Sequence, residues 1–183
     1  MRVLFGLVLG LCIGGTPHAV RSDMTASAYT PPPLQAYEFI SDQVMGGVST
    51  GEVRITGSDD ARHLHLSGSV STANRGGFIQ ARATLPAPLP AGARGVVVRV
   101  RGNGARYFVH LRTRGTLLPW QYYQAPFGTT GDWQKVRLPF AAFAPSGALL
   151  RDTPRPETVT SLAAVAYGRD HEADLHFEWL GVY

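Results

Sequence analysis

The chain has 183 residues, a formal net charge of +4 and a single cysteine, and this length predicts one folded domain. Its basic residues are scattered, and no run of five to eight of them marks a nucleic-acid-binding arm, so a nucleic-acid partner is not expected. Beyond the first residues, no stretch is apolar enough to predict an integral membrane span.

The N-terminal residues have the pattern of a targeting signal. Arg2 precedes an apolar run, residues 3–15, which is too short to cross a bilayer but has the length of a signal-peptide core. We therefore expect a signal peptide over residues 1–22, with cleavage after Ser22 or as late as Ala28, and an exported protein, periplasmic or extracellular. Cys12 lies inside the apolar run, so the mature chain would hold no disulfide and would depend on its core for stability.

A period of two dominates the rest of the chain. Residues 23–33, which end in three prolines, predict an extended linker, and residues 34–183 predict the domain. Within it, polar and apolar residues alternate in short runs bounded by Gly, Pro, Asn or Asp. These runs are 52–55, 63–66, 78–82, 96–101, 106–112, 123–127, 133–137 and 175–179. Nine or ten strands predict an all-β fold, an antiparallel two-sheet β-sandwich or jelly roll.

Two local elements are also expected. Gly102-Asn103-Gly104 separates two of the alternating runs, and residues of these types tolerate the positive φ of a tight turn, which predicts a hairpin. Residues 140–143 are the one segment expected to form a short helix.

One motif points toward catalysis but lacks its context. Residues 47–51 match the G-x-S-x-G nucleophile elbow, in which a strand precedes the serine and a helix follows it. The residues that follow here, 52–55, alternate as a strand, so we interpret Ser49 as a loop serine. No acid–base pair or other nucleophile is found, and the chain is not expected to be an enzyme.

The histidines and acidic residues allow a metal site without predicting one. His63 and His65 lie on one side of a predicted strand and could meet His176 or Asp174, but nothing in the sequence predicts that contact. The acidic residues of segment 170–174 could hold Ca²⁺, although such a segment is more often a solvated turn. We predict no metal and no cofactor.

Arginine and aromatic residues give the strongest indication of a binding site. If residues 96–100 and 107–111 bury their valines, the opposite side of these strands carries a set of basic and aromatic side chains. The predicted binding residues are Arg99, Arg101, Arg106, His110, Arg112, Trp120, Tyr122 and Gln124. Arginine offers planar donors and tryptophan a stacking face, which suit an anionic or sugar-like ligand or a protein partner.

The most specific motif lies at residues 41–51, Ser-Asp-Gln-Val-Met-Gly-Gly-Val-Ser-Thr-Gly, and weaker motifs follow in order at 76–78, 98–107, 123–127 and 133–140. With these motifs the chain resembles the complex I intermediate-associated protein family, whose members carry a D-x-V-M-G-G-x-S-x-G signature. The resemblance covers about residues 36–183. We interpret its signature residues as structural, with two glycines permitting a tight turn and the aspartate capping N–H groups of that loop. They are Asp42, Met45, Gly46, Gly47, Ser49 and Gly51.

The resemblance implies a galactose-binding-like jelly roll and a role as an assembly factor for the NADH:ubiquinone oxidoreductase of mitochondria, with no catalytic residues. A secretory signal would place this chain away from the matrix-side arm that the mitochondrial members help to build. Two hypotheses therefore stay open. One is a chaperone-like assembly factor that binds a protein client, and the other is a module that binds carbohydrate or another small ligand.

Overall fold

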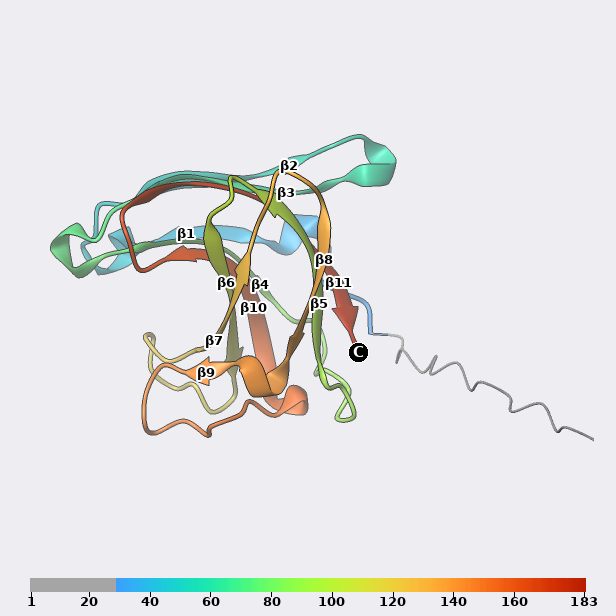
Figure 1. Cartoon of the computed structure of the whole chain (residues 1–183). Helices are drawn as coiled ribbons and strands as arrows, with labels where there is room; N and C mark the ends of the chain where they lie inside the picture. The colour runs from blue at the N-terminus through green and yellow to red at the C-terminus, as the bar shows by residue number, and fades with distance from the viewer. Residues whose placement is uncertain (1–28) are drawn as a thin grey trace, which may run out of the picture.

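The computed structural model describes residues 29–183 (Figure 1). The expected signal peptide, residues 1–22, and the later cleavage site at Ala28 lie outside the described residues. Of the expected linker, the Tyr29 ring lies beside the Trp179 ring, with centroids 5.4 Å apart and planes tilted by 40°, and Pro32 is buried. Residues 29–33 therefore lie against the domain.

Within residues 29–183, eleven strands form two sheets in which all neighbouring strands are antiparallel. The six-stranded sheet has the order β1 (Glu38–Ser41), β4 (Phe78–Thr84), β10 (Val159–Tyr167), β6 (Arg106–Thr113), β7 (Tyr123–Gly128) and β9 (Ala144–Pro145). The five-stranded sheet has the order β2 (Thr50–Thr56), β3 (His63–Val70), β11 (His171–Val182), β5 (Gly95–Gly102) and β8 (Gln134–Pro139). The prediction of an all-β, two-sheet sandwich is confirmed.

Single turns of 3₁₀ helix connect some of the strands. They are η1 (Leu34–Ala36), η2 (Asp42–Met45), η3 (Asp59–Ala61), η4 (Ala73–Arg75), η5 (Phe140–Ala142) and η6 (Pro156–Thr158). The short helix expected at residues 140–143 is the turn η5. Across residues 29–183, no helix has the length and apolar character needed to cross a membrane.

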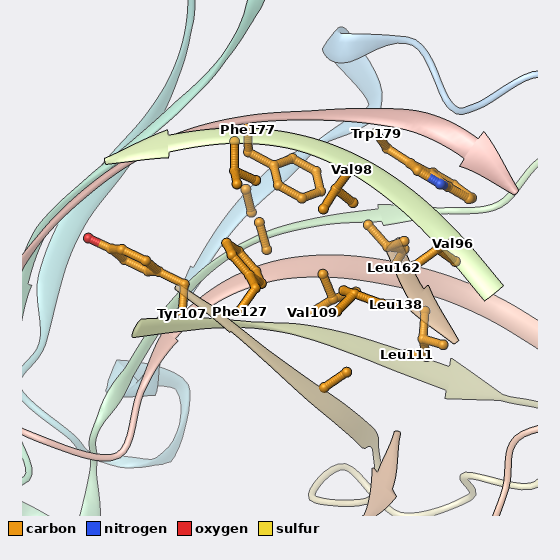
Figure 2. Packing of buried hydrophobic residues seen from close by; sticks show 14 of the residues in the cluster. Val96, Val98, Tyr107, Val109, Leu111, Phe127, Leu138, Leu162, Phe177 and Trp179 are labelled. Atoms are coloured by element: carbon orange, nitrogen blue, oxygen red, sulfur yellow. The ribbon is translucent and has the colours of Figure 1, made fainter. Parts of the chain in front are cut away.

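The core lies between the two sheets and is built from the apolar positions of the alternating runs. Figure 2 shows Val96, Val98 and Phe177 of the five-stranded sheet pointing toward Tyr107 and Val109 of the six-stranded sheet. All five side chains are fully buried, as the period-two pattern predicts. Because these positions point inward, the alternate residues of each strand form the two outer faces, where a ligand can reach them.

The hairpin predicted at Gly102-Asn103-Gly104 is wrong. Strand β5 pairs with β11 and β8, whereas β6 pairs with β10 and β7, so the connection passes from one sheet to the other. The amide of Asn103 holds this crossing, since its nitrogen donates to the Glu172 carbonyl (2.9 Å) and its oxygen accepts from the Tyr107 hydroxyl (2.8 Å). Turn residues signal a change of direction but not which strand the chain will pair with next.

Candidate functional site

A cleft of about 670 Å³ crosses the outer face of the six-stranded sheet. Turn η2 lies at one end, and the loop between β6 and β7, residues 114–122, lies at the other. The cleft is lined by Ile40, Val44, Met45, Arg75, Gly76, Phe78, Gln80, Arg82, His110, Arg112, Pro119, Trp120, Gln121, Tyr122, Ser146, Ser161, Ala163 and Tyr167. Because these residues come from β1, β4, β10, β6 and the segment leading into β7, the cleft runs across the strands rather than along one of them.

Small residues of the central strand β10 form the floor of the cleft. Ala163 lies directly between Arg82 of β4 and His110 of β6 in the sheet register, and both Ala163 and Ser161 are buried although they face away from the core. Long side chains on the flanking strands and short ones on the middle strand produce a depression in the sheet surface. An extended ligand can therefore reach the floor at its centre.

The side chain of Arg112 organises the loop at one end of the cleft. Its guanidinium donates hydrogen bonds to the carbonyls of Thr116 (3.2 Å), Leu118 (2.9 Å) and Pro119 (3.4 Å). Burial lowers the pKa of Arg112, and the nearby charge of Arg82 lowers it further. Arg112 was predicted as a ligand-binding residue, but most of its donors are already used within the protein, so its first role is to shape the loop.

The same loop is tied to the strand beyond it, which places Trp120 at the cleft. The hydroxyl of Ser146, which follows β9, donates to the Trp120 carbonyl (3.1 Å) and accepts from the Tyr122 amide (2.9 Å). Figure 1 shows the segments that follow β6 and β9 at the same end of the sandwich. The Trp120 side chain is 63% exposed, so its backbone is fixed while its ring remains available for contact.

An aromatic cluster lies next to Trp120. The His110 ring stacks on Tyr122 with centroids 4.1 Å apart and an interplanar angle of 8°, and Tyr167 meets both rings edge-on. Burial lowers the pKa of His110 to about 3, so the imidazole is neutral at ordinary pH. Among the described residues its Nε2 has no hydrogen-bond partner. A buried polar atom without a partner costs free energy that a ligand group in the cleft could recover.

The buried histidine also predicts a pH dependence of stability. Unfolded His110 titrates at about pH 6.5 and the folded residue at about pH 3, so the unfolded chain binds more protons between these values and stability falls as the pH falls. We expect the free energy of unfolding to drop by about 2 kcal/mol from this group between pH 7.5 and pH 5. Urea denaturation of the parent and of His110→Asn at both pH values measures it. An unchanged pH dependence in the variant would contradict the assignment.

Arginine dominates the charge of the cleft. Arg75, Arg82 and Arg112 line it, and no aspartate or glutamate is among the lining residues. Arg75 has a left-handed backbone, with φ of 62°, and follows Asn74 with φ of 55°. Two consecutive non-glycine residues in this region are strained, and such strain is often retained at functional sites. The cleft is therefore cationic as well as aromatic.

Buried Asp42 holds the loop of the signature motif. Its carboxylate accepts hydrogen bonds from the Ser49 amide (2.9 Å), the Ser49 hydroxyl (2.5 Å), and the amides of Gly77 (2.5 Å) and Phe78 (3.3 Å). Burial raises the pKa of Asp42, but these hydrogen bonds favour the charged form more strongly, and the pKa lies below its ordinary value. The expectation that Asp42 caps its own loop is confirmed, and the same carboxylate also fixes the start of β4.

The glycines of the motif are required by that carboxylate and by the turn. Gly46 has a left-handed φ of 86°, as a tight turn predicts. A Cβ at Gly47 would lie 2.3 Å from the Asp42 carboxyl carbon, and a Cβ at Gly76 would lie 2.3 Å from its Oδ2. Gly51 also has no room for a Cβ, which would meet the Ser67 carbonyl oxygen at 2.4 Å. The motif therefore folds a loop around one buried charge.

This loop carries two apolar side chains to the end of the cleft. Val44 is 74% exposed and Met45 is 58% exposed, although both belong to a turn whose ends are tightly held. Both line the cleft. The interpretation of Met45 as structural is therefore incomplete, because its side chain lies at the candidate site.

We expect Gly47→Val to lower the free energy of unfolding by at least about 2 kcal/mol, since the new side chain would displace the Asp42 carboxylate. The cause is steric contact rather than backbone strain, because Gly47 does not have a positive φ. Thermal and urea denaturation measure the effect. Gly131→Val is the matched control, since a Cβ at Gly131 meets nothing within 4 Å. Equal losses in the two variants would contradict this explanation.

Ser49 lies in the loop before β2, as predicted, and its role there is structural. It is fully buried, its hydroxyl donates to Asp42, and the same oxygen accepts from the Ser71 amide (3.0 Å). Strand β2 follows it immediately, and no helix does. The context that a nucleophile elbow requires is missing, and a buried hydroxyl offers no access to a substrate.

The structure divides the predicted arginine and aromatic surface between the two sheets, because the predicted hairpin does not form. His110, Arg112, Trp120 and Tyr122 meet at the cleft, and Gln124 lies beside His110 in the sheet register. Arg106 is at the start of β6 and outside the cleft. Arg99 and Arg101 lie on the outer face of the five-stranded sheet.

On that second face, the two arginines contact Trp133. The Arg99 guanidinium lies 4.4 Å from the Trp133 ring centroid and 3.3 Å from a Glu178 carboxylate oxygen, and the Arg101 guanidinium lies 5.2 Å from the same ring. His63 and His65 also lie on this face, with His176 and Asp174 beside them.

Comparison with known families decides the classification. Residues 27–173 match the family described as complex I intermediate-associated protein 30 (CIA30). The chain belongs to the CIA30 family. No curated protein matches the sequence. The predicted membership is therefore confirmed, and the cleft, with the signature loop at its end, is a feature of this CIA30 domain.

Solved structures similar to this CIA30 domain include two carbohydrate-binding modules and an exo-beta-agarase. A family 11 carbohydrate-binding module from Clostridium thermocellum, in complex with a beta-1,3-1,4-mixed-linked tetrasaccharide, is 11% identical with a TM-score of 0.64, over 80% of this chain and 88% of that one. A family 30 carbohydrate-binding module is 16% identical with a TM-score of 0.53, over 81% and 87%. An exo-beta-agarase is 6% identical with a TM-score of 0.51, over 81% and 23%. These likenesses show the galactose-binding-like jelly-roll fold alone.

Several cleft residues were not predicted from the sequence. They are Ile40, Val44, Arg75, Phe78, Gln80, Arg82, Ser161, Ala163 and Tyr167. Most lie on β1, β4 and β10, which are far from β6 in the sequence. Only the alternation in residues 78–82 gave a signal, since it places Arg82 and Gln80 on the same outer face.

Proposed function

We propose that this CIA30 domain is a non-catalytic binding module whose cleft holds an extended oligosaccharide chain with acidic substituents. The observation that carries the proposal is the cleft itself, which crosses the sheet and combines aromatic rings with three arginines, with no aspartate or glutamate among its described lining residues. An exported location, proposed from residues 1–22, would bring it to cell-surface or extracellular polysaccharide.

The aromatic side chains support a sugar ligand. The exposed ring of Trp120 presents a flat apolar face, and the apolar faces of sugar rings stack on such surfaces. His110 lines the cleft, and its buried Nε2 has no hydrogen-bond partner among the described residues, whereas its register neighbour Gln124 does not line the cleft. A ligand hydroxyl that reaches this nitrogen would supply the missing hydrogen bond. The similar carbohydrate-binding modules share the fold that forms this face.

The charges support an acidic ligand. Arg82 and Arg75 lie in the cleft beside Arg112, whose donors are largely used by the loop. A planar guanidinium binds a carboxylate or sulfate with two parallel hydrogen bonds. No aspartate or glutamate is among the described lining residues, and Glu38, which is opposite Arg82 in the strand register, lies outside the lining.

Affinity electrophoresis in gels that contain neutral or acidic polysaccharides tests the proposal. We expect retardation by a uronic-acid or sulfated polymer such as alginate, pectate or carrageenan, and little by the neutral polymers laminarin and lichenan. Binding should weaken as salt rises from 50 to 500 mM, because salt screens the arginines. No retardation by any acidic polymer, or stronger retardation by the neutral ones, would contradict it.

A protein client remains a second candidate, and the exposed Val44 and Met45 favour it. Isolated exposed apolar residues are ordinary, but these two belong to the family signature and are held outward by a buried hydrogen-bond network. Apolar anchors of this kind suit a protein surface. The predicted chaperone-like role in assembly would use this end of the cleft.

Site-specific photocrosslinking in the native host distinguishes this candidate. A benzophenone side chain placed at Val44 should capture a single defined protein if a client binds there, whereas the same group at exposed Arg155 should not. Capture from Val44 with no polysaccharide retardation would replace the carbohydrate proposal with the protein one. An absence of capture would remove the second candidate.

A further inference from the structure

Imidazole and carboxylate groups converge on the outer face of the five-stranded sheet, on the opposite side of the molecule from the cleft. The ligand atoms of His65, Asp174 and His176 all lie within 4.8 Å of one another. His65 of β3 and His176 of β11 are directly opposite each other in the sheet register, and their rings stack with centroids 4.3 Å apart and planes 3° from parallel. Asp174 is two residues before His176 and therefore points to the same face.

We propose that His65, Asp174 and His176 form a binding site for a divalent transition-metal ion of the zinc type. Two imidazoles and one carboxylate match the ligands of zinc sites that keep an open position. Ligand atoms about 2.0–2.1 Å from a tetrahedral ion are roughly 3.3 Å from each other. The separations are 2.8 Å from His65 Nε2 to Asp174 Oδ1, which now form a hydrogen bond, and 3.8 Å from His176 Nε2 to the same oxygen. The two rings, now stacked nearly parallel, would have to turn so that both lone pairs point at one ion.

A chain of hydrogen bonds leaves a lone pair on the His176 nitrogen that faces the proposed ion position. His63 Nδ1 lies 2.9 Å from the carbonyl oxygen of Ala61, which can only accept, so this nitrogen carries the proton in neutral His63. His63 Nε2 is then an acceptor, and it lies 3.0 Å from His176 Nδ1, which must donate to it. The hydroxyl oxygen of Thr56 is also 3.0 Å from His63 Nε2. The remaining nitrogen of His176, Nε2, is left without a proton and faces Asp174.

Such a second ligand layer is typical of metal-binding histidines, whose other ring nitrogen donates to a fixed acceptor. Burial and the charges of His65, Arg101 and His63 together lower the pKa of His176 to about 4, against the opposing effect of Asp174. Arg101, opposite His176 in the register, opposes a dication, but its guanidinium lies over the Trp133 ring. Asp174 supplies the compensating negative charge.

The bound ion would join β3 to β11, which are paired neighbours in the five-stranded sheet. Three protein ligands leave a fourth position for water or for a side chain of a partner. The site does not involve any residue of the cleft, so it stands independently of the proposed ligand.

Isothermal titration of the untagged protein with ZnCl₂, after treatment with a chelator, tests the proposal. We expect one equivalent to bind, with affinity at least tenfold lower in His65→Ala and in His176→Ala. His63→Ala should lower it by roughly 10- to 100-fold, as loss of a second-layer partner does. His171→Ala removes a histidine of the same strand outside the cluster, and should leave zinc binding unchanged.

Further measurements distinguish loss of zinc binding from loss of folding in the variants. Cobalt in place of zinc should give the visible absorption of a four-coordinate site in the parent and not in His176→Ala, and circular dichroism should show that the variants remain folded. Zinc should also raise the unfolding temperature of the parent but not of His176→Ala. The proposal is wrong if 100 μM zinc does not bind, or if folded His65→Ala and His176→Ala bind it as tightly as the parent.

Discussion

Replacing Asp42 with asparagine should lower the free energy of unfolding by about 3–5 kcal/mol, among the largest effects of any single substitution in this domain. The side chain is fully buried and accepts four hydrogen bonds, three of them from backbone amides. An amide of the same size has one oxygen instead of two and no charge, and its NH₂ group would face N–H donors. Buried donors would lose their partner, at a cost that the unfolded chain avoids because water hydrates them.

Two further variants distinguish the loss of the Asp42 hydrogen-bond network from the general effect of a substitution. Ser49→Ala removes only one donor to Asp42 and one acceptor for the Ser71 amide, and should cost about 1–2 kcal/mol. Glu52→Gln changes an exposed carboxylate nearby, and should cost less than about 0.5 kcal/mol. Urea denaturation at pH 7 measures all three. If Asp42→Asn costs no more than Glu52→Gln, the buried network does not stabilise the fold.

The pH dependence of the same variants gives a second check. The pKa of Asp42 is lowered by folding, so its contribution is fully present above its ordinary value of 3.8 and is lost as the pH falls through the lower folded value. The difference between the parent and Asp42→Asn should therefore shrink below about pH 4, while it stays constant from pH 5 to 8. A difference that grows on acidification would contradict the assignment of a charged Asp42.

The sequence predicted the fold better than it predicted the site, because the two depend on different information. Alternation in segments such as 96–101 and 106–112 reports which side chains are buried, and the core positions among them are buried as expected. Strand order is not contained in alternation. The error at residues 102–104 shows this, since one wrong pairing moved Arg99 and Arg101 to the wrong surface.

Strand β10 shows why the cleft itself was missed. Its sequence, Val-Thr-Ser-Leu-Ala-Ala-Val-Ala-Tyr, does not alternate, because one side of the strand faces the core and the other forms the floor beneath longer neighbours. A central strand buried on both sides has a nearly continuous run of small and apolar residues. The residues at 161 and 163 are small, but only their pairing with β4 and β6 makes them the floor of a cleft.

Trp120→Ala should weaken binding of an acidic polysaccharide by roughly 10- to 100-fold, equivalent to about 1–3 kcal/mol, while the unfolding midpoint stays nearly unchanged. The ring is exposed at the cleft, whereas the main chain beneath it is held through Ser146 and the loop carbonyls bound by Arg112. Removing the ring therefore takes away a stacking surface and leaves the loop in place. Affinity electrophoresis and thermal denaturation of the same protein measure the two quantities.

Substitutions of the cleft arginines should have different effects on binding and on stability in the same assays. Arg82→Gln should weaken binding by roughly tenfold and reduce its salt dependence, with little change in stability, because the structure uses Arg82 as a charge on the sheet surface. Arg112→Ala should lower both binding and the unfolding midpoint, because three loop carbonyls lose their donor. Arg155→Ala, outside the cleft, is the control and should change neither. If Arg155→Ala weakens binding as much as Arg82→Gln does, the net charge of the protein attracts the polymer and the cleft does not. If Trp120→Ala unfolds the domain, the Trp120 ring supports the core and does not bind the ligand.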